Sequence, residues 1–331
     1  MRINKKMKKS LGKEFVSGWF MAILGIAMMQ AQKEPQYTQY MYNIGAFNPA
    51  YVGTVVVPDI SAAYRAQWID IEGAPRTIRL GVNLPLRNKK NGLGFNVAND
   101  ALGPVSQTYL DVAYSFQVNL NDETKLSFGL DAGGSFLNVD LSKGAFDNPN
   151  EPTLSQQPVS QFYPTVGAGV FLYGTQWYFG TSIPNFLKDG IYNADVASVV
   201  EDKIQFNFIG GYVFELSDAL KFKPAFLVNA LSGSPININI STNFLIKDTF
   251  TAGLSYRVDN AFSGLAGFQV SDQVFIGYSY DYNTNTLGAF NSGSHELICK
   301  FSLGKVSSKF VKGPNQKEKD KPKQIDTPRF F

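Results

Sequence analysis

Apolar and polar residues alternate with a period of two along most of the chain between residues 59 and 304. In residues 107–119, alternate positions carry Thr, Leu, Val, Tyr and Phe, and the positions between them are mainly Gln, Asp, Ala, Ser and Asn. Successive side chains of a β-strand point to opposite faces, so this pattern predicts strands with one apolar and one polar face. Residues 236–246 repeat the pattern over the length of about 9–11 residues that a tilted membrane strand needs. Strands of soluble sandwiches are shorter, about 5–6 residues, so the length favours a membrane barrel.

Segments of this kind recur about fourteen times, and each is a predicted strand. They cover residues 59–68, 76–84, 92–100, 107–119, 124–134, 163–173, 175–183, 203–215, 220–230, 236–246, 249–258, 262–270, 273–282 and 294–303. Short turns and long loops alternate between them, and the longest loops are residues 135–162, 184–202 and 283–293. Bacterial outer-membrane barrels alternate short periplasmic turns with long outer loops in this way. We therefore predict an all-β fold, a transmembrane antiparallel outer-membrane β-barrel of about 14 strands, with about twelve or sixteen strands as alternatives.

The two ends of the chain differ from its body. Residues 1–31 place six Lys or Arg before an apolar stretch and end in Gln30-Ala31, an order typical of a cleaved secretory signal peptide. An uncleaved anchor is the alternative, but the apolar stretch is shorter than the roughly 20 residues of a spanning helix. Residues 305–331 are rich in Lys and Pro, so we expect a basic, disordered periplasmic tail. Between these ends we expect an N-terminal mouth or plug segment, residues 32–58, and the barrel, residues 59–304.

The composition agrees with a barrel that faces lipid. Charged residues make up 17% of the chain and aromatic residues 14%, whereas about 25% charged residues is usual for soluble domains. The net charge of +3 comes from the two basic ends, and acidic residues outnumber basic residues in the body. An acidic body argues against nucleic acid as a partner.

The chain holds one His and one Cys, too few for a disulfide, a typical zinc site or a Cys–His nucleophile. His295 and Glu296 are neighbours on a predicted strand, so they point to opposite faces and do not form an acid–base pair. We therefore expect no enzyme activity, no catalytic residue, no cofactor and no metal site.

The side chains of the predicted strands divide by parity. Charged residues of both signs share the inward parity: Arg65, Arg79, Asp111, Lys125, Asp131, Glu215, Lys221, Lys223, Arg257, Asp281, Glu296 and Lys300. Such a set predicts a lumen that is crossed by ion pairs and largely filled, rather than an open pore. Aromatic residues share the outward parity, where rings favour the membrane interface: Trp68, Trp177, Tyr212, Tyr256, Tyr278, Tyr280 and Tyr282.

Several motifs follow one another in a fixed order. Residues 35–43 read PQYTQYMYN, residues 47–53 FNPAYVG, residues 64–68 YRAQW and residues 73–77 GAPRT. Asn99-Asp100, Gly103-Pro104, then GYSYDY at 277–282 and SHEL at 294–297 complete the series. In this order they resemble the PorP/SprF family, membrane proteins of the Bacteroidetes type IX secretion system. The resemblance covers nearly the whole mature chain.

The resemblance implies a barrel that works with the type IX secretion machinery. Its further implied partner is a very large adhesin with a C-terminal sorting domain, including adhesins of gliding motility. The end of the tail, Thr327 to Phe331, resembles the gliding-associated, SprF-like branch in particular. The residues that carry the motifs or could contact partners are Gln39, Tyr40, Asn48, Pro49, Ala50, Arg65, Gln67, Trp68, Gly73, Ala74, Pro75, Phe330 and Phe331.

These residues suggest three local roles. Residues 33–57 hold too few apolar residues to form a domain alone, so we expect them to pack into or across the periplasmic mouth, with Asn48-Pro49 making a turn; a plain lead-in to the first strand is the alternative. Gly73-Ala74-Pro75 would shape the first outer loop and let its backbone lie close to a neighbour. Phe330-Phe331 would anchor the basic tail on a periplasmic partner, and a solvated tail is the alternative.

Two functions fit this sequence. The first is a non-enzymatic outer-membrane component of secretion or surface attachment, whose partners are the secretion machinery, the adhesin and outer-membrane lipid. The second is an outer-membrane channel or transporter for small solutes or hydrophobic ligands.

Overall fold

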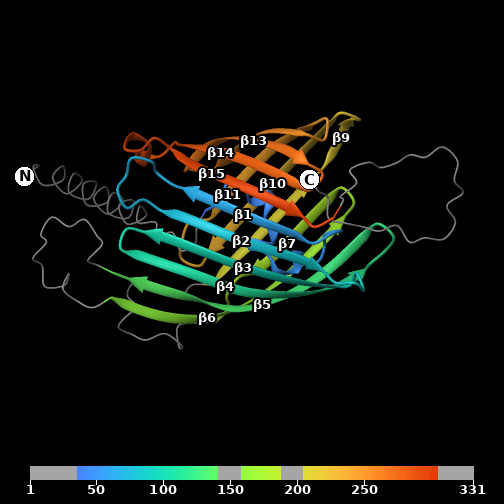
Figure 1. Cartoon of the computed structure of the whole chain (residues 1–331), viewed down its shortest axis with the longest axis horizontal. Helices are drawn as coiled ribbons and strands as arrows, with labels where there is room; N and C mark the ends of the chain where they lie inside the picture. The colour runs from blue at the N-terminus through green and yellow to red at the C-terminus, as the bar shows by residue number, and fades with distance from the viewer. Residues whose placement is uncertain (1–35, 141–157, 188–203, 305–331) are drawn as a thin grey trace, which may run out of the picture. The chain divides into compact units, whose positions relative to one another are not determined.

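The computed structural model describes residues 36–140, 158–187 and 204–304 (Figure 1). The predicted signal peptide, residues 1–31, and the predicted tail with Phe330 and Phe331 lie outside the described residues. The strands are β1 (Asp59–Ala66), β2 (Arg76–Pro85), β3 (Asn91–Leu102), β4 (Val105–Asn119), β5 (Thr124–Val139), β6 (Val159–Gly174), β7 (Trp177–Ile183), β8 (Gln205–Tyr212), β9 (Phe214–Ser217), β10 (Leu220–Leu231), β11 (Asn237–Ile246), β12 (Phe250–Arg257), β13 (Ala261–Ser271), β14 (Val274–Asn283) and β15 (Ser294–Ser302).

These strands form one closed ring. Strands that follow one another in the chain pair antiparallel, apart from β8 and β9, and β15 pairs with β1, which joins the two ends of the barrel. The strands β8 and β9 both pair with β10 and are separated by Val213 alone, so they form one barrel strand in two pieces. The result is a closed antiparallel barrel of 14 strands, which confirms the predicted fold and strand number.

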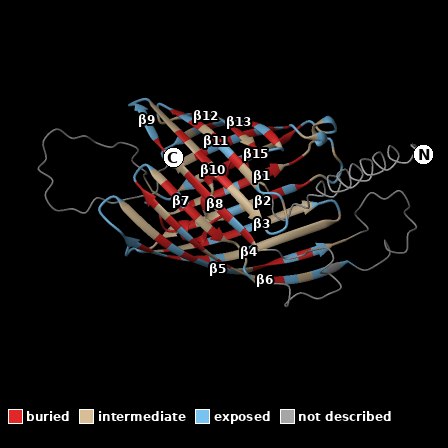
Figure 2. Ribbon diagram, turned by 180° about the vertical axis from the view of Figure 1, so that it is seen from behind, coloured by how far each residue is buried: buried red, intermediate tan, exposed pale blue. Residues whose placement is uncertain are grey.

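Outward and inward side chains differ in polarity, as the alternation predicted. Along β13, Phe262 and Phe268 are exposed, whereas Ser263 is buried. A similar alternation of more and less buried positions runs along most of the other strands (Figure 2). The outer wall therefore presents apolar side chains, and every strand has a neighbour for its backbone hydrogen bonds, which is what a hydrocarbon environment requires. None of the helices in the described part of the chain has the length and apolar character to span a membrane.

Several predicted strand boundaries are wrong. The strand predicted at 59–68 ends at Ala66, because the Gln67 N–H donates to the Pro75 carbonyl and closes a loop. Trp68 therefore lies in this loop with a φ of 47°, and not on the outward face of a strand. The loop predicted at 135–162 is shorter at both ends, since β5 runs to Val139 and β6 begins at Val159. An inward, buried Leu137 broke the expected polar parity there.

Residues 36–57, here called the inner segment, pass inside the ring. They form three short 3₁₀ helices, η1 (Tyr40–Tyr42), η2 (Ile44–Ala46) and η3 (Pro49–Tyr51). Another 3₁₀ helix, η7 (Thr286–Ala289), lies between β14 and β15. The inner segment bonds to side chains or backbone of β2, β4, β6, β7, β8, β11, β14 and β15. Because these strands come from every part of the ring, the segment lies within the lumen.

Candidate functional site

The start of the inner segment is bound by buried charges. Arg65 on β1 forms ion pairs with two carboxylates, at 2.6 Å from Nη2 to Asp281 Oδ2 and 2.9 Å from Nη1 to Glu296 Oε2. The Thr38 N–H donates to Glu296 at 2.8 Å and the Gln39 N–H at 3.0 Å, while the Thr38 hydroxyl donates to Asp281 at 2.8 Å. We call these five residues the charged anchor. Buried charges are costly unless they are paired and hydrogen-bonded, and here both conditions hold.

Arg257 on β12 adds a second cation beside the charged anchor. Its Nη2 donates to the Thr38 hydroxyl oxygen at 3.3 Å and its Nε to Asn239 Oδ1 at 2.7 Å. The two guanidinium groups therefore face the same threonine as the two carboxylates, and the charges of the group balance. Balance matters here because an excess charge at a buried site has no water to stabilise it.

The middle of the inner segment is bound without charges. The Asn48 side-chain amide donates to the Val170 carbonyl of β6 at 3.0 Å and to the Thr181 carbonyl of β7 at 3.2 Å. Its Oδ1 accepts the Ala50 N–H at 2.9 Å, which caps η3, and Pro49 fills the first helical position, where no N–H is needed. The Asn48-Pro49 turn predicted from the sequence is therefore present, and it bridges two barrel strands.

The residue before this turn extends the same contact. The Phe47 carbonyl accepts a hydrogen bond from the Ser182 hydroxyl of β7 and one from the Asn207 amide of β8 at 3.3 Å. Residues 47–50 and the wall of β5 to β8 that receives them are here called the neutral anchor. The short strands β7 and β8 are thus tied to β6 from inside the barrel as well as through their own ladders.

Glycines in the wall make room for the neutral anchor. A Cβ on Gly129 would lie 2.2 Å from the Ala50 nitrogen, and one on Gly169 would lie 2.1 Å from Asn48 Oδ1. A Cβ on Gly180 would likewise lie 2.7 Å from Asn48 Nδ2. These three positions face inward, so any side chain there would displace the turn.

The end of the inner segment crosses to β2 and β4. The Gly53 N–H donates to Asn83 at 2.7 Å, and the Gln117 amide donates to the Gly53 carbonyl at 2.8 Å. Gly53 has a φ of 72°, and its Cα faces Gly92 so closely that a Cβ would lie 2.4 Å from the Gly92 Cα. Only glycine fits this conformation and this distance.

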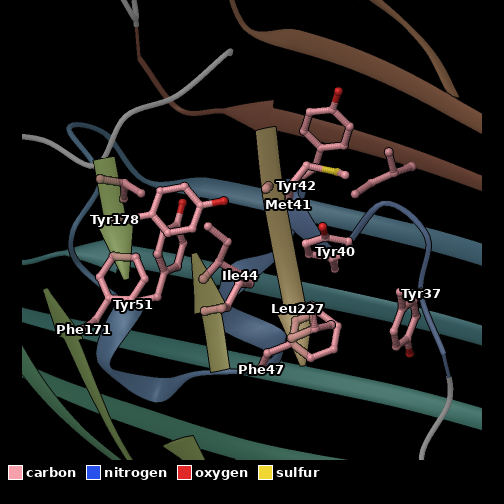
Figure 3. Packing of buried hydrophobic residues seen from close by; sticks show 14 of the residues in the cluster. Tyr37, Tyr40, Met41, Tyr42, Ile44, Phe47, Tyr51, Phe171, Tyr178 and Leu227 are labelled. Carbon is pink, nitrogen blue, oxygen red and sulfur yellow. The ribbon is translucent and has the colours of Figure 1, made fainter. Parts of the chain in front are cut away.

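Aromatic rings fill the space between the anchors (Figure 3). The ring of Tyr51 meets that of Phe171 edge-on at 5.5 Å, and the ring of Tyr42 lies 4.9 Å from that of Phe275. The Tyr40 hydroxyl bonds to Ser241 at 3.0 Å. Burial raises the pKa of Tyr40 and Tyr42, so both phenols stay protonated at neutral pH. The lumen is therefore packed around the inner segment with aromatic rings, and the Tyr40 hydroxyl among them is hydrogen-bonded to the wall.

The structure separates the sequence-predicted residues into two groups. Gln39, Tyr40, Asn48, Pro49, Ala50 and Arg65 lie inside the barrel, with Gln39 and Arg65 at the charged anchor and Asn48, Pro49 and Ala50 at the neutral anchor. Gln67, Trp68, Gly73, Ala74 and Pro75 lie in the β1–β2 loop instead. There the Gly73 carbonyl accepts the Gly103 N–H at 2.8 Å, so the two backbones approach closely.

Other residues of the site were missing from the predicted set. The sequence marks Asp281, Glu296 and Arg257 only as inward charges, and their shared parity with Arg65 is the signal that it offers. The wall glycines and the β7 and β8 polar residues gave no such signal, because glycine in a strand more often marks a weak position.

The chemistry of the described residues is limited. They contain no group of three or more His, Cys, Asp or Glu residues placed to hold a metal ion. The His295 Nδ1 lies 2.6 Å from the Tyr278 hydroxyl on the outer face, while Glu296 is buried on the inner face. The two neighbours are therefore on opposite faces, as β-strand geometry requires.

Comparison with known proteins gives one strong match. A family model described as "Type IX secretion system membrane protein PorP/SprF" matches residues 29–301. A search of curated proteins found no match to the chain. The family match identifies the chain as a membrane protein, and its structure is a closed barrel with an apolar outer wall. Barrels of this kind lie in bacterial outer membranes, which confirms the predicted location.

Solved structures give only distant likenesses. A FadL homologue of Pseudomonas aeruginosa has a TM-score of 0.41 at 12% identity, over 84% of this chain and 97% of that one. The toluene transporter TbuX of Ralstonia pickettii has a TM-score of 0.46 at 9% identity, over 80% and 93%. The NanC porin has a TM-score of 0.40 at 10% identity, over 75% and 99%. These likenesses are too distant to carry an argument about what this chain binds.

Proposed function

The chain belongs to the PorP/SprF family of type IX secretion system membrane proteins, and from this premise we propose that it holds large adhesins for secretion or surface attachment and performs no catalysis. As a member it is an outer-membrane component of that secretion system and works with its machinery. The finer role is a scaffold: the barrel presents loops and mouths to its partners, and cargo does not pass through its lumen. The main observation in support of this proposal is that the inner segment occupies the lumen.

The inner segment acts as a plug in this proposal. It is bound at its start by the charged anchor, in its middle by the neutral anchor and at its end by Asn83 and Gln117. Removing it would leave Asp281 and Glu296 without their backbone and hydroxyl donors inside a low-dielectric lumen. A segment held in this way is a fixed part of the barrel rather than a gate that opens with each solute.

The rival function, a channel or transporter for small solutes or hydrophobic ligands, needs a path through the same lumen. In the described part of the chain, that path is filled by the inner segment and its aromatic packing. The contacts therefore favour the scaffold over the channel.

In this proposal, the adhesin binds to the outer loops of the barrel. Loops are the usual place for partner contacts, because they vary without disturbing the scaffold. The two candidate loops are those predicted at residues 135–162 and 184–202, and residues 141–157 and 188–203 lie outside the described residues. Assignment to the gliding-associated branch is proposed on the tail sequence alone, which also lies outside them.

Affinity capture tests the proposal. The full chain would be tagged, solubilised from native outer membranes in mild detergent and analysed by mass spectrometry. We expect type IX machinery and a very large protein with a C-terminal sorting domain. An unrelated barrel of similar abundance, tagged in the same way, provides the control. Capture of nutrient-uptake components alone would contradict the proposed role.

A further inference from the structure

We propose that a hollow in the outer wall, over the β6–β7 seam, is a binding site for one acyl chain of a membrane phospholipid. The hollow has a volume of about 630 Å³ and is lined mainly by outward residues of β4 to β8. Specific ligand sites commonly have volumes of roughly 300–1,000 Å³. A barrel wall is convex on its outside, so a hollow of this size is a local feature that needs a cause.

The cause is a patch of small residues inside a ring of large ones. Ala168 and Thr181 point outward on neighbouring strands, and the backbone of Gly129 and Gly169 completes the floor. Exposed rings surround this floor: Tyr114, Phe116, Phe128 and Phe206. The rim therefore stands higher than the floor and leaves a groove between the rings.

The position of the hollow indicates what occupies it. Val170, on its lining, is four residues from Gly174, where β6 ends at a short turn. At about 3.3 Å per residue, the hollow lies roughly 13 Å along the strand from that turn. The apolar band of an outer-membrane barrel is about 25 Å tall, so this depth is within the hydrocarbon. The Tyr114 hydroxyl already donates to Asn91 Oδ1 at 2.9 Å, so this group of the rim needs no polar partner from a ligand.

The floor of the hollow is held in place from the other side of the wall. Val170 and Thr181 line the hollow with their side chains, and their carbonyls accept the Asn48 amide inside the barrel. β6 pairs with β7 only from Ala168 to Tyr173, although it pairs with β5 along its whole length. The seam is thus short and is fixed from inside by the neutral anchor, so the hollow is formed before any lipid arrives. An acyl chain in it would cover the seam from outside.

Photolabelling tests this site. The full mature chain would be placed in vesicles of phosphatidylethanolamine and phosphatidylglycerol that contain phosphatidylethanolamine with a diazirine in one acyl chain. Adducts would be mapped by mass spectrometry. We expect saturable labelling concentrated on Phe128, Leu130 and Phe206. Ala168→Phe fills the floor without reaching the inner face, and we expect it to lower this labelling at least about five-fold.

The matched control is Ala266→Phe, the same change at an exposed outward position of β13. It should leave labelling of the hollow unchanged. Thr181→Leu is a second filling variant, in case Ala168→Phe prevents folding, and it should also lower the labelling. Labelling spread evenly over the outer wall would overturn the proposal, as would unchanged labelling in a folded filling variant. Labelling of the hollow by a free diazirine fatty acid, but not by the phospholipid, would also overturn it.

Discussion

The charged anchor and the neutral anchor hold the same inner segment by different physical means. The charged anchor joins β1, β14 and β15 to residues 38–39 through ion pairs and charge-assisted hydrogen bonds. The neutral anchor joins β6, β7 and β8 to residues 47–48 through amide and hydroxyl bonds and through the absence of side chains on wall glycines. The charged anchor should break when a charged side chain loses its partner, and the neutral anchor should break when a side chain is added at a wall glycine. The two anchors should therefore respond to opposite kinds of substitution.

The largest effect is expected at the charged anchor. Arg65→Met leaves Asp281 and Glu296 buried without their shared cation, and breaking a buried pair in this way costs about 3–5 kcal/mol. Urea unfolding of the mature chain in detergent would measure the loss. Arg76→Met removes an exposed arginine from the neighbouring strand and should change the free energy of unfolding by less than about 0.5 kcal/mol. Equal losses in the two variants would mean that the ion pairs do not hold the segment.

Added volume should break the neutral anchor. Gly129→Ala places a Cβ against the Ala50 backbone nitrogen, so the turn must move, and overpacking of this kind costs about 1–3 kcal/mol. Gly264→Ala is the matched control, because no atom lies within 4 Å of a Cβ there. The same unfolding measurement applies. A Gly129→Ala variant as stable as Gly264→Ala would show that the turn does not press against the wall.

Loss of hydrogen bonds at the neutral anchor should have a smaller effect. Asn48→Ala removes the bonds to Val170 and Thr181 and the cap on Ala50, and loss of such a cap costs about 0.5–2 kcal/mol. Asn121→Ala removes a similar local cap in an exposed turn that lies outside the lumen. If Asn48→Ala destabilised the barrel no more than Asn121→Ala, the bridge between β6 and β7 would be without energetic value.

The smallest expected effect is the coupling between the anchors. They share no side chain, and their strands are not neighbours in the ring. The losses of Glu296→Gln and Asn48→Ala should therefore add to within about 0.5 kcal/mol in the double variant. A combined loss well below the sum would show that the segment detaches as one unit once either anchor fails.

The same comparison explains what the sequence could and could not predict. Alternation predicted the strands because it repeats within each strand, and it failed at Leu137, where an apolar side chain points inward. The charges of Arg65, Asp281 and Glu296 were visible as inward residues, but their meeting depends on the pairing of β15 with β1, which joins opposite ends of the chain. Local patterns carry no information about that closure.

The neutral anchor was harder to predict, for a physical reason. Gly129, Gly169 and Gly180 act through the side chain they lack, and the turn that needs this space is about 80 or more residues earlier in the chain. The Asn48-Pro49 turn itself was predictable, because Asn and Pro favour turns by local hydrogen bonding and fixed φ. What the turn touches depends on the curvature of the whole barrel.

Electrical recording tests the central claim most directly, namely that the inner segment closes the lumen. The purified full mature chain would be inserted in planar bilayers, with a general porin as the positive control and insertion verified by protease protection. We predict no stable conductance from the intact chain, because the segment is bound to strands all around the ring. A stable, reproducible open pore from the intact chain would contradict this account.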